Sequence, residues 1–267
     1  MIKEFDFLVI GSGIAGMSFA LKVAHKGKVA LICKTELEEA NTFFAQGGIA
    51  SVTNTLVDNF DKHIEDTMIA GDWISDRAAV EKVVREAPGQ IKELIDWGVD
   101  FDKNDKGDFD LHKEGGHSEF RILHHKDNTG AEIQESLIRA VKTHPNIEIF
   151  NRHFAVEIIT QHHMGIIVTR HTPGIKCYGA YVLNEDTGEV DTFLSKVTLM
   201  ATGGVGAVYK TTYRRRYCHG LPCQRSRTGY GVHPVPPHSA LSSGRPSLFP
   251  DYGSDARIWC RITQYGW

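Results

Sequence analysis

The start of the chain alternates between apolar runs and short breaks in the way that is typical of a strand, a turn and a helix. Phe7–Ile10 is an apolar run bounded by glycine, which predicts a short buried parallel strand. Apolar residues then recur at helical spacing over Met17–His25. A second apolar run, Val29–Cys33, predicts the next strand, so we expect a strand–helix–strand unit here.

The rest of the pattern predicts three helices and five strands. The helices are expected over Asp58–Ala70, Ser75–Trp97 and Thr129–Thr143. Asp76 suits the first turn of the second helix, and Gly98 suits its end. The strands are expected over Ile147–Phe150, Ala155–Thr160, Gly165–Arg170, Cys177–Leu183 and Thr192–Met200. Residues 41–50 and 101–125 are interpreted as loops, the second with short strands, and His162–His163 as a hairpin turn.

The break after the first strand has the spacing G-x-G-x-x-G, formed by Gly11, Ser12, Gly13, Ile14, Ala15 and Gly16. Gly11 permits the tight turn, Gly13 lets the backbone approach a pyrophosphate, and Gly16 lets the helix pack closely on the strand. The first N–H groups of the helix would then point at the phosphates. Placed between a strand and a helix, this spacing predicts a dinucleotide site, against the alternative of a plain βα turn.

The composition is that of an ordinary globular protein, with 267 residues, 41% hydrophobic and 24% charged. A formal net charge of -3 gives no reason to expect nucleic acid or an acidic membrane as a partner. No apolar run reaches the roughly 18 residues of a membrane span, and no signal-peptide pattern is present, so we expect a cytoplasmic location. The five cysteines are an odd number, which argues against a disulfide framework. Cys218 and Cys223 lack a second ligand pair at zinc spacing, so we expect no metal site from them.

Three further motifs accompany the glycine loop: NTFFAQGGIA at residues 41–50, KEGGHSEFRILH at residues 113–124 and ATGGVGAVY at residues 201–209. With these motifs, residues 1–212 resemble the succinate dehydrogenase/fumarate reductase flavoprotein family. The resemblance implies an α/β fold, a Rossmann-like FAD-binding domain of the glutathione-reductase type with a small antiparallel strand insertion. It also implies that FAD contacts the residues of the glycine loop together with Lys34, Asn41, Thr42, Phe43, Phe44, Ala45, Gln46, Gly47, Gly48, Phe154, Ala155, Ala201, Thr202, Gly203 and Gly204.

Two positions separate the branches of this family. Succinate dehydrogenases and many fumarate reductases have a histidine, bonded covalently to the flavin, where this chain has Asn41. An amide cannot form that bond, so the resemblance implies that FAD is held non-covalently. A Rossmann site for a dinucleotide usually has an acid at the end of the second strand, but Lys34 stands there. The lysine weakens a general NAD interpretation and matches the branch that oxidises L-aspartate to iminoaspartate for quinolinate and NAD synthesis.

Glu114 matches a family acid near the substrate, and the resemblance implies that it binds the α-ammonium group of L-aspartate. Succinate lacks that group, so a buried carboxylate facing it would discriminate strongly between the two. The alternative interpretation of Glu114 is a solvated loop residue, and His117, His124 and His125 are interpreted as loop or packing histidines. The implied reaction moves a hydride from the aspartate α-carbon to flavin N5, and electrons then pass to fumarate or oxygen. The implied partners are L-aspartate and, as a candidate only, quinolinate synthase.

The sequence changes character after Thr212. Residues 213–267 contain eight arginines, no lysine, no glutamate and six of the nine prolines, whereas residues 1–212 contain six arginines and sixteen lysines. If each tail codon gives its last two bases and the next codon gives its first, the allowed codons spell family motifs. These are TGDGIAM from Tyr213, IQFHPTAL from His233 and TEAMRGYGA from Tyr252. We therefore expect a frame-shifted tail without a regular fold, in place of the domain that would cap the substrate.

Two other functions stay open on the sequence. One is a flavoprotein of the fumarate reductase or succinate dehydrogenase type, against which Asn41 and Lys113–Glu114 argue. The other is a non-catalytic fragment that binds FAD or a partner, since the expected domains are 1–212, an incomplete FAD-binding domain, and 213–267, an aberrant tail. On this interpretation the 267-residue chain itself is expected to have no turnover.

Overall fold

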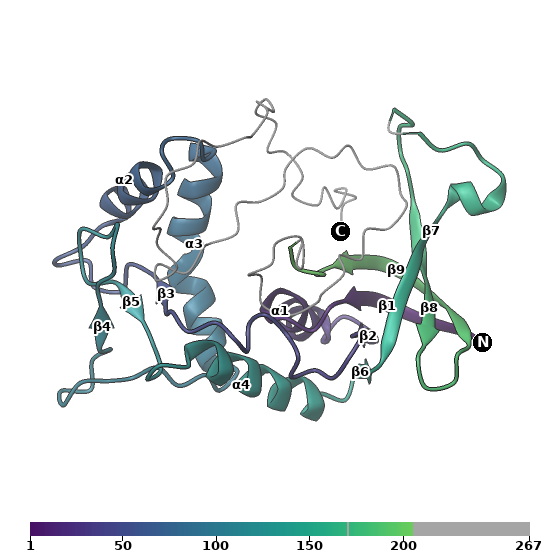
Figure 1. Cartoon of the computed structure of the whole chain (residues 1–267), viewed down its shortest axis with the longest axis horizontal. Coiled ribbons are helices and arrows are strands. Elements are labelled where there is room, and N and C mark those ends of the chain that lie inside the picture. Colours follow the sequence, from purple (N-terminus) through teal and green to yellow (C-terminus); the bar gives the residue numbers. More distant parts are fainter. Residues whose placement is uncertain (170, 205–267) are drawn as a thin grey trace, which may run out of the picture. The chain divides into compact units, whose positions relative to one another are not determined.

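The computed structural model describes residues 1–169 and 171–204, of which Met1–Gly203 form one compact unit (Figure 1). The expected boundary between residues 212 and 213, and the whole tail, lie outside the described residues. A mixed sheet with the strand order β6-β2-β1-β9-β8-β7 organises the unit. The chain is therefore an α/β protein, as the alternation of strand and helix patterns predicts.

Four parallel strands form one half of the sheet: β1 (Ile2–Ile10), β2 (Val29–Ile32), β6 (Ile147–Phe150) and β9 (Val190–Met200). Their last residues lie in register, because Ile10 pairs with both Ile32 and Met200, and Ile32 pairs with Phe150. All four strands therefore end at the same edge of the sheet. Loops that follow parallel strands meet at this carboxyl edge, where open α/β sheets bind their ligands.

The other half of the sheet is antiparallel and consists of β7 (His153–Thr160) and β8 (Cys177–Asn184), which extend from β9. The strand expected at Gly165–Arg170 is wrong over residues 165–169, and Arg170 lies outside the described residues. Gly165 has φ +81° and ends a short 3-10 helix, η1 (Gln161–Met164), so His162–His163 lie in a helical turn. Ile167 is 80% exposed, because none of the described strands pairs with this stretch, and alternation alone does not make a strand.

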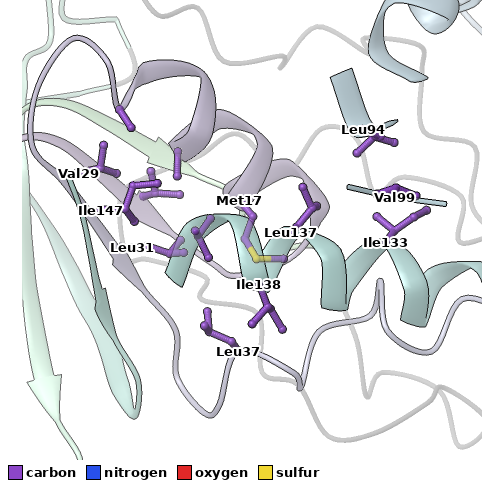
Figure 2. Close-up of a cluster of buried hydrophobic side chains, with 14 of the residues drawn as sticks. Met17, Val29, Leu31, Leu37, Leu94, Val99, Ile133, Leu137, Ile138 and Ile147 are labelled. Carbon is purple, nitrogen blue, oxygen red and sulfur yellow. The ribbon is translucent and has the colours of Figure 1, made fainter. Parts of the chain in front are cut away.

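Helices α1 (Ile14–Val23) and α4 (Thr129–Thr143) pack together, and Figure 2 shows Met17 of α1 beside Leu137 and Ile138 of α4. All three side chains are buried with residues of β2. The apolar spacing of α4 puts its buried residues on one face, so its bounds agree with those expected from the sequence.

Helices α2 (Phe60–Ala70) and α3 (Arg77–Asp96) pack against each other. In the sequence they lie between β2 and β6 of the large sheet. Asp76 was expected in the first turn of α3, but it precedes the helix and caps it, accepting hydrogen bonds from the N–H groups of Ala78 and Ala79. Gly98 follows the helix with φ +99°, the left-handed conformation expected of a stop residue.

A small second sheet has the order β3-β5-β4, with β3 (Ile49–Ala50), β5 (Ile122–Leu123) and β4 (Leu111–His112). Residues 41–48 are a loop as expected, but Ile49–Ala50 form a strand because they pair with Leu123 and Ile122 of β5, 74 and 72 positions later in the chain. A local pattern does not contain that pairing.

The Cys33 thiol follows β2 and is buried, and burial raises its pKa to about 12. Since the thiolate is the reactive form, we expect Cys33 to resist alkylation by iodoacetamide at pH 8 in the folded protein. The exposed Cys177 is expected to react under the same conditions. Peptide mapping by mass spectrometry measures both, and labelling of Cys33 at the rate of Cys177 would contradict the burial.

Candidate functional site

The glycine loop turns directly against the end of β9. Gly11 has φ +115°, and a Cβ on it would lie 2.3 Å from the carbonyl oxygen of Ala201. A Cβ on Gly16 would lie 1.9 Å from the carbonyl oxygen of Gly11, so α1 sits close on the turn. Both glycines are therefore required by the protein's own packing, and the structure brings the first and the last predicted cofactor motifs together.

Gly13 differs from these two glycines. Its φ is -76°, and among the described residues a Cβ on it would meet only Thr42 Oγ1, at 3.4 Å. The missing side chain therefore leaves open space in front of the first turn of α1. A space of this kind, at the amino end of a helix whose first N–H groups lack partners within the helix, is suited to a phosphate.

The first-turn N–H groups do not all face that space. The N–H of Ile14 donates a hydrogen bond of 3.0 Å to Thr42 Oγ1, which corrects the expectation that the whole first turn points at phosphates. Thr42 belongs to the second predicted cofactor motif, so this bond joins residues 41–48 to the glycine loop. The motifs predict that both segments contact one cofactor, but they do not predict the hydrogen bond between Ile14 and Thr42.

Helix α4 binds both the glycine loop and residues 41–48, through two residues that the sequence motifs do not include. Gln134 is fully buried, and its Nε2 donates to the carbonyl oxygens of Ser12 at 2.9 Å and Leu37 at 2.7 Å. Its Oε1 has no hydrogen-bond partner among the described residues. Gly130 donates its N–H to the carbonyl oxygen of Ala45, and a Cβ there would lie 2.0 Å from the carbonyl oxygen of Thr42. The only signal in the sequence was a glutamine on the apolar face of a predicted helix.

Glu114 is exposed, which agrees with the alternative of a loop residue and not with the buried carboxylate expected at the substrate. Its carboxylate nevertheless lies beside the second motif. A Cβ on Gly47 would lie 4.0 Å from Glu114 Oε1. Residues 41 and 44–47 are also exposed, so this carboxylate and the loop present an open surface together. The structure therefore brings the predicted substrate residue next to the predicted flavin motif, although 67 positions separate Glu114 from Gly47.

The remaining predicted cofactor residues also lie at the carboxyl edge. Lys34 is half-buried directly after β2, and the N–H of His153 donates to the carbonyl oxygen of the neighbouring Cys33. This bond brings Phe154 and Ala155, the next residues of β7, to the end of β2. Of the last motif, Ala201, Thr202, Gly203 and Gly204 are described, and the residues that follow lie outside the described part.

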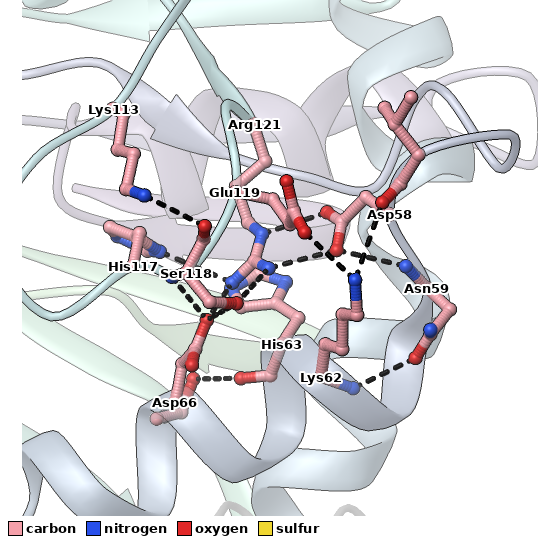
Figure 3. A network of polar contacts seen from close by, with 12 residues as sticks. Asp58, Asn59, Lys62, His63, Asp66, Lys113, His117, Ser118, Glu119 and Arg121 are labelled. Atoms are coloured by element: carbon pink, nitrogen blue, oxygen red, sulfur yellow. Dashed lines mark hydrogen bonds and ion pairs between the residues drawn. The ribbon is translucent and has the colours of Figure 1, made fainter.

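A buried ionic cluster stands beside this site, in the segment that carries α2 and β5. Arg121 is fully buried, and its guanidinium holds both oxygens of Asp58 at 2.8 Å and one oxygen of Asp66 at 2.6 Å (Figure 3). Burial by itself would raise the pKa of Asp66, but hydrogen bonds from Ser118 and Arg121 outweigh it and hold that pKa below its usual value. Ser118 and Arg121 both belong to the motif that contains Glu114, so the cluster fixes the position of that motif.

His63 lies against the cluster, and burial together with the nearby Arg121 charge lowers its pKa to about 4. A lowered pKa means that the folded state binds fewer protons than the unfolded state between pH 4 and 6.5. We therefore expect full stability above pH 6.5 and a loss of up to about 3 kcal/mol as the pH falls to 4. Urea unfolding at several pH values measures this loss. His63→Leu should flatten the slope, whereas substitution of the exposed His25 by leucine should leave it unchanged.

A sequence profile of the family described as FAD binding domain matches residues 6–233. The chain belongs to this family. The flavoprotein is 45% identical over 210 residues to L-aspartate oxidase 2-a, chloroplastic, of Nicotiana tabacum, covering 79% of this chain and 31% of that protein. It is 43% identical over 214 residues to the L-aspartate oxidase of Vibrio cholerae, covering 78% of this chain and 39% of that protein. The flavoprotein thus spans about a third of the length of these relatives.

Solved structures of larger flavoproteins have the same fold. E. coli quinol fumarate reductase FrdA matches with a TM-score of 0.69 and 27% identity, over 78% of this chain and 34% of its own. Mycobacterium smegmatis Sdh1 matches with a TM-score of 0.66 and 27% identity, over 77% of this chain and 35% of its own. The α/β FAD-binding fold of the succinate dehydrogenase/fumarate reductase type, with a mixed sheet, is confirmed. Within residues 1–169 and 171–204, no helix has the length and apolar character needed to cross a membrane.

Proposed function

We propose that residues 1–212 are the N-terminal part of an enzyme that oxidises L-aspartate to iminoaspartate, with FAD held non-covalently. The observation that carries this proposal is the position of the Glu114 carboxylate beside Gly47. Gly47 lies in the same loop as Asn41, which replaces the histidine of the covalent flavoproteins. Identities of 43% and 45% to named L-aspartate oxidases support it. Fumarate or oxygen is the proposed acceptor, and the product would supply quinolinate for NAD synthesis.

The residues present fit FAD. The space at Gly13 would accept a pyrophosphate, and the carboxyl edge of four parallel strands would hold the dinucleotide along its length. When bound, FAD supplies the acceptor for the hydride of the substrate. We also propose that the unit is of the glutathione-reductase type, which the parallel order β6-β2-β1-β9 with antiparallel β8 and β7 supports.

The chain's own contribution to substrate selection would be electrostatic. The Glu114 carboxylate would bind the α-ammonium group of L-aspartate and leave succinate without a matching charge. The Arg121 cluster would keep Glu114 in place, because Arg121 and Ser118 are tied to Asp58 and Asp66. Glu114 is therefore proposed as the residue that separates an aspartate oxidase from its dicarboxylate-using relatives.

We further propose that residues 213–267 are translated out of frame, so that this chain lacks the substrate-capping domain and has no turnover. The codon register through TGDGIAM, IQFHPTAL and TEAMRGYGA supports this proposal. Resequencing the gene across codons 205–220 tests it. An unbroken frame in the present phase, with the tail peptides found by mass spectrometry, would contradict it.

The activity is tested on the protein with its reading frame restored. We expect L-aspartate, and not succinate, to bleach the flavin absorption under anaerobic conditions. We expect Glu114→Gln to lower kcat/KM for L-aspartate by about 30-fold or more, because the ammonium loses its charged partner. Glu119→Gln removes a charge paired with Lys62 in the same segment and should leave kcat/KM within about twofold. Faster reduction by succinate would favour the fumarate reductase alternative.

A further inference from the structure

Three potential metal ligands lie within or directly beside β4 and β5, the short strands whose positions Figure 1 shows. In the antiparallel register, Leu111 pairs with Leu123 and His112 pairs with Ile122. The pairing ends there, because Asp102 lies between the backbones of Asp110 and His124, and the two-residue period of a strand puts His112 on the same face as Asp110. The carboxylate and imidazole ligand atoms of Asp110, His112 and His124 all lie within 4.8 Å of one another.

His124 is the buried member of this group, with a side chain 9% exposed. Neither of its ring nitrogens makes a hydrogen bond among the described residues, although Asp102 Oδ2 lies 3.2 Å from Nδ1. A neutral imidazole has one N–H and one lone pair, and a protonated one has two N–H groups, so a buried ring without any hydrogen bond is unusual. Its Nε2 lies 3.9 Å from Asp110 Oδ2, and the exposed His112 ring stacks on it with 3.6 Å between ring centroids.

We propose that Asp110, His112 and His124 form a binding site for a divalent transition-metal ion of the Zn²⁺ class. Two imidazoles and one carboxylate are ligands that zinc accepts, with water in the fourth position. Ligand atoms around tetrahedral zinc lie about 3.4 Å apart, given bonds of roughly 2.0–2.2 Å. The His112 and His124 rings are stacked, and stacked rings cannot both direct an in-plane nitrogen at one ion. Binding would therefore require the exposed Asp110 and His112 side chains to rotate out of the arrangement seen here.

Asp102 provides the outer support that metal-binding histidines require. Its Oδ2 lies 3.2 Å from Nδ1 of His124, on the side of the ring away from Asp110. Backbone hydrogen bonds fix Asp102 between the two ligands, because its N–H donates to the carbonyl oxygen of His124 and its own carbonyl accepts from Asp110. A carboxylate at Nδ1 orients the ring and directs Nε2 to a metal. Asp102 is thus a positioning residue rather than a ligand.

Nitrogen ligands exclude the main alternatives for this site. Mg²⁺ and Ca²⁺ take oxygen ligands, whereas imidazole suits zinc and its neighbours in the first transition row. The strands of the hairpin are only two residues long each, so a metal ion across Asp110 and His124 would join them at the point where the ladder ends. The site does not depend on FAD or on L-aspartate, and its test is independent of the proposed activity.

The test uses the full 267-residue chain, stripped of metal with a chelator and titrated with Co²⁺ and then Zn²⁺. We expect one equivalent of Co²⁺ to produce visible ligand-field absorption without a thiolate charge-transfer band, and Zn²⁺ to displace it. The absence of a thiolate band matters because Cys218 and Cys223 of the same chain could bind the metal instead. Zinc should also raise the melting temperature.

Two variants at exposed positions test the ligands without disturbing the core. His112→Ala and Asp110→Asn should each weaken Zn²⁺ binding by at least about tenfold, and Asp102→Asn by about 10–100-fold. Substitutions at the exposed His25 (to alanine) and Asp105 (to asparagine) are the controls and should leave the affinity unchanged. Far-UV circular dichroism monitors folding of each variant. The absence of micromolar binding, a thiolate band, or equal affinity in His112→Ala and the wild type would overturn the proposal.

Discussion

Replacing Arg121 with methionine is expected to lower the free energy of unfolding by about 3–5 kcal/mol. The guanidinium is fully buried and donates three hydrogen bonds to Asp58 and Asp66 and one to Ser118 (Figure 3). Methionine fills a similar volume, so the loss does not come from a cavity. It comes from two carboxylates, one of them 2% and the other 16% exposed, which lose their countercharge. Urea unfolding followed by circular dichroism measures the change.

Two further variants separate this explanation from a general sensitivity to lost arginines. Arg77 forms ion pairs with Glu65 and Glu81 but is 53% exposed, so Arg77→Met should change the free energy of unfolding by less than about 1 kcal/mol. Combining Arg121→Met with Asp58→Asn should recover part of the loss, because one uncompensated charge is gone. A loss in Arg121→Met no greater than that in Arg77→Met would show that the cluster does not stabilise the fold.

Gly11→Ala is expected to prevent stable folding, whereas Gly13→Ala is expected to leave the fold intact and to weaken FAD binding. A Cβ at Gly11 would lie 2.3 Å from the carbonyl oxygen of Ala201, directly after β9, at a φ of +115° that alanine rarely adopts. At Gly13 the backbone is in the extended region, and within 4 Å a Cβ would meet, among residues 1–169 and 171–204, only the Thr42 hydroxyl at 3.4 Å. The methyl group would instead occupy the space in front of α1. Soluble yield and circular dichroism report the first effect, and FAD retained after gel filtration reports the second.

The matched control is Gly89→Ala in the middle of α3, where a Cβ would meet no atom of the described residues within 4 Å. It should stabilise the protein by about 0.5–1 kcal/mol, since alanine suits a helix interior better than glycine. FAD binding should be unaffected by it. If Gly13→Ala retained FAD at the level of Gly89→Ala, the space at Gly13 would not be the pyrophosphate site.

The sequence predicted those elements whose burial follows a regular period. The strand at Ile147–Phe150 and the helix at Thr129–Thr143 have the expected bounds, because one face of each is packed against the core. The pattern failed at residues 165–169, where none of the described strands pairs with the chain and the apolar Ile166 and Ile167 are exposed. It also missed the strand Ile49–Ala50, whose partner lies far along the chain.

The candidate site was predicted as a set of motifs and not as a set of contacts. The glycine loop and ATGG were expected at one cofactor, and the register of Ile10 with Met200 accounts for their proximity. The hydrogen bonds of Gln134 to Ser12 and Leu37 were not predicted, since they join positions 122 and 97 residues apart. The pairing of Arg121 with Asp58 across 63 residues was missed for the same reason. Spacing identifies local turns, whereas long-range polar contacts depend on how the elements pack.

The pairing of β1 with β9 sets an order on the maturation of the protein. Ile2 pairs with Thr192, and the terminal ammonium of Met1 contacts Asp191, 190 residues later. Among the described strands β1 is synthesised first, and it has both neighbours only after β9, the last of them, has been made. Long closure of this kind slows folding and keeps the edge of β1 open meanwhile. A nascent chain that ends before residue 190 would have the glycine loop but not β9 and Ala201, which lie against Gly11. It could therefore not yet enclose a cofactor.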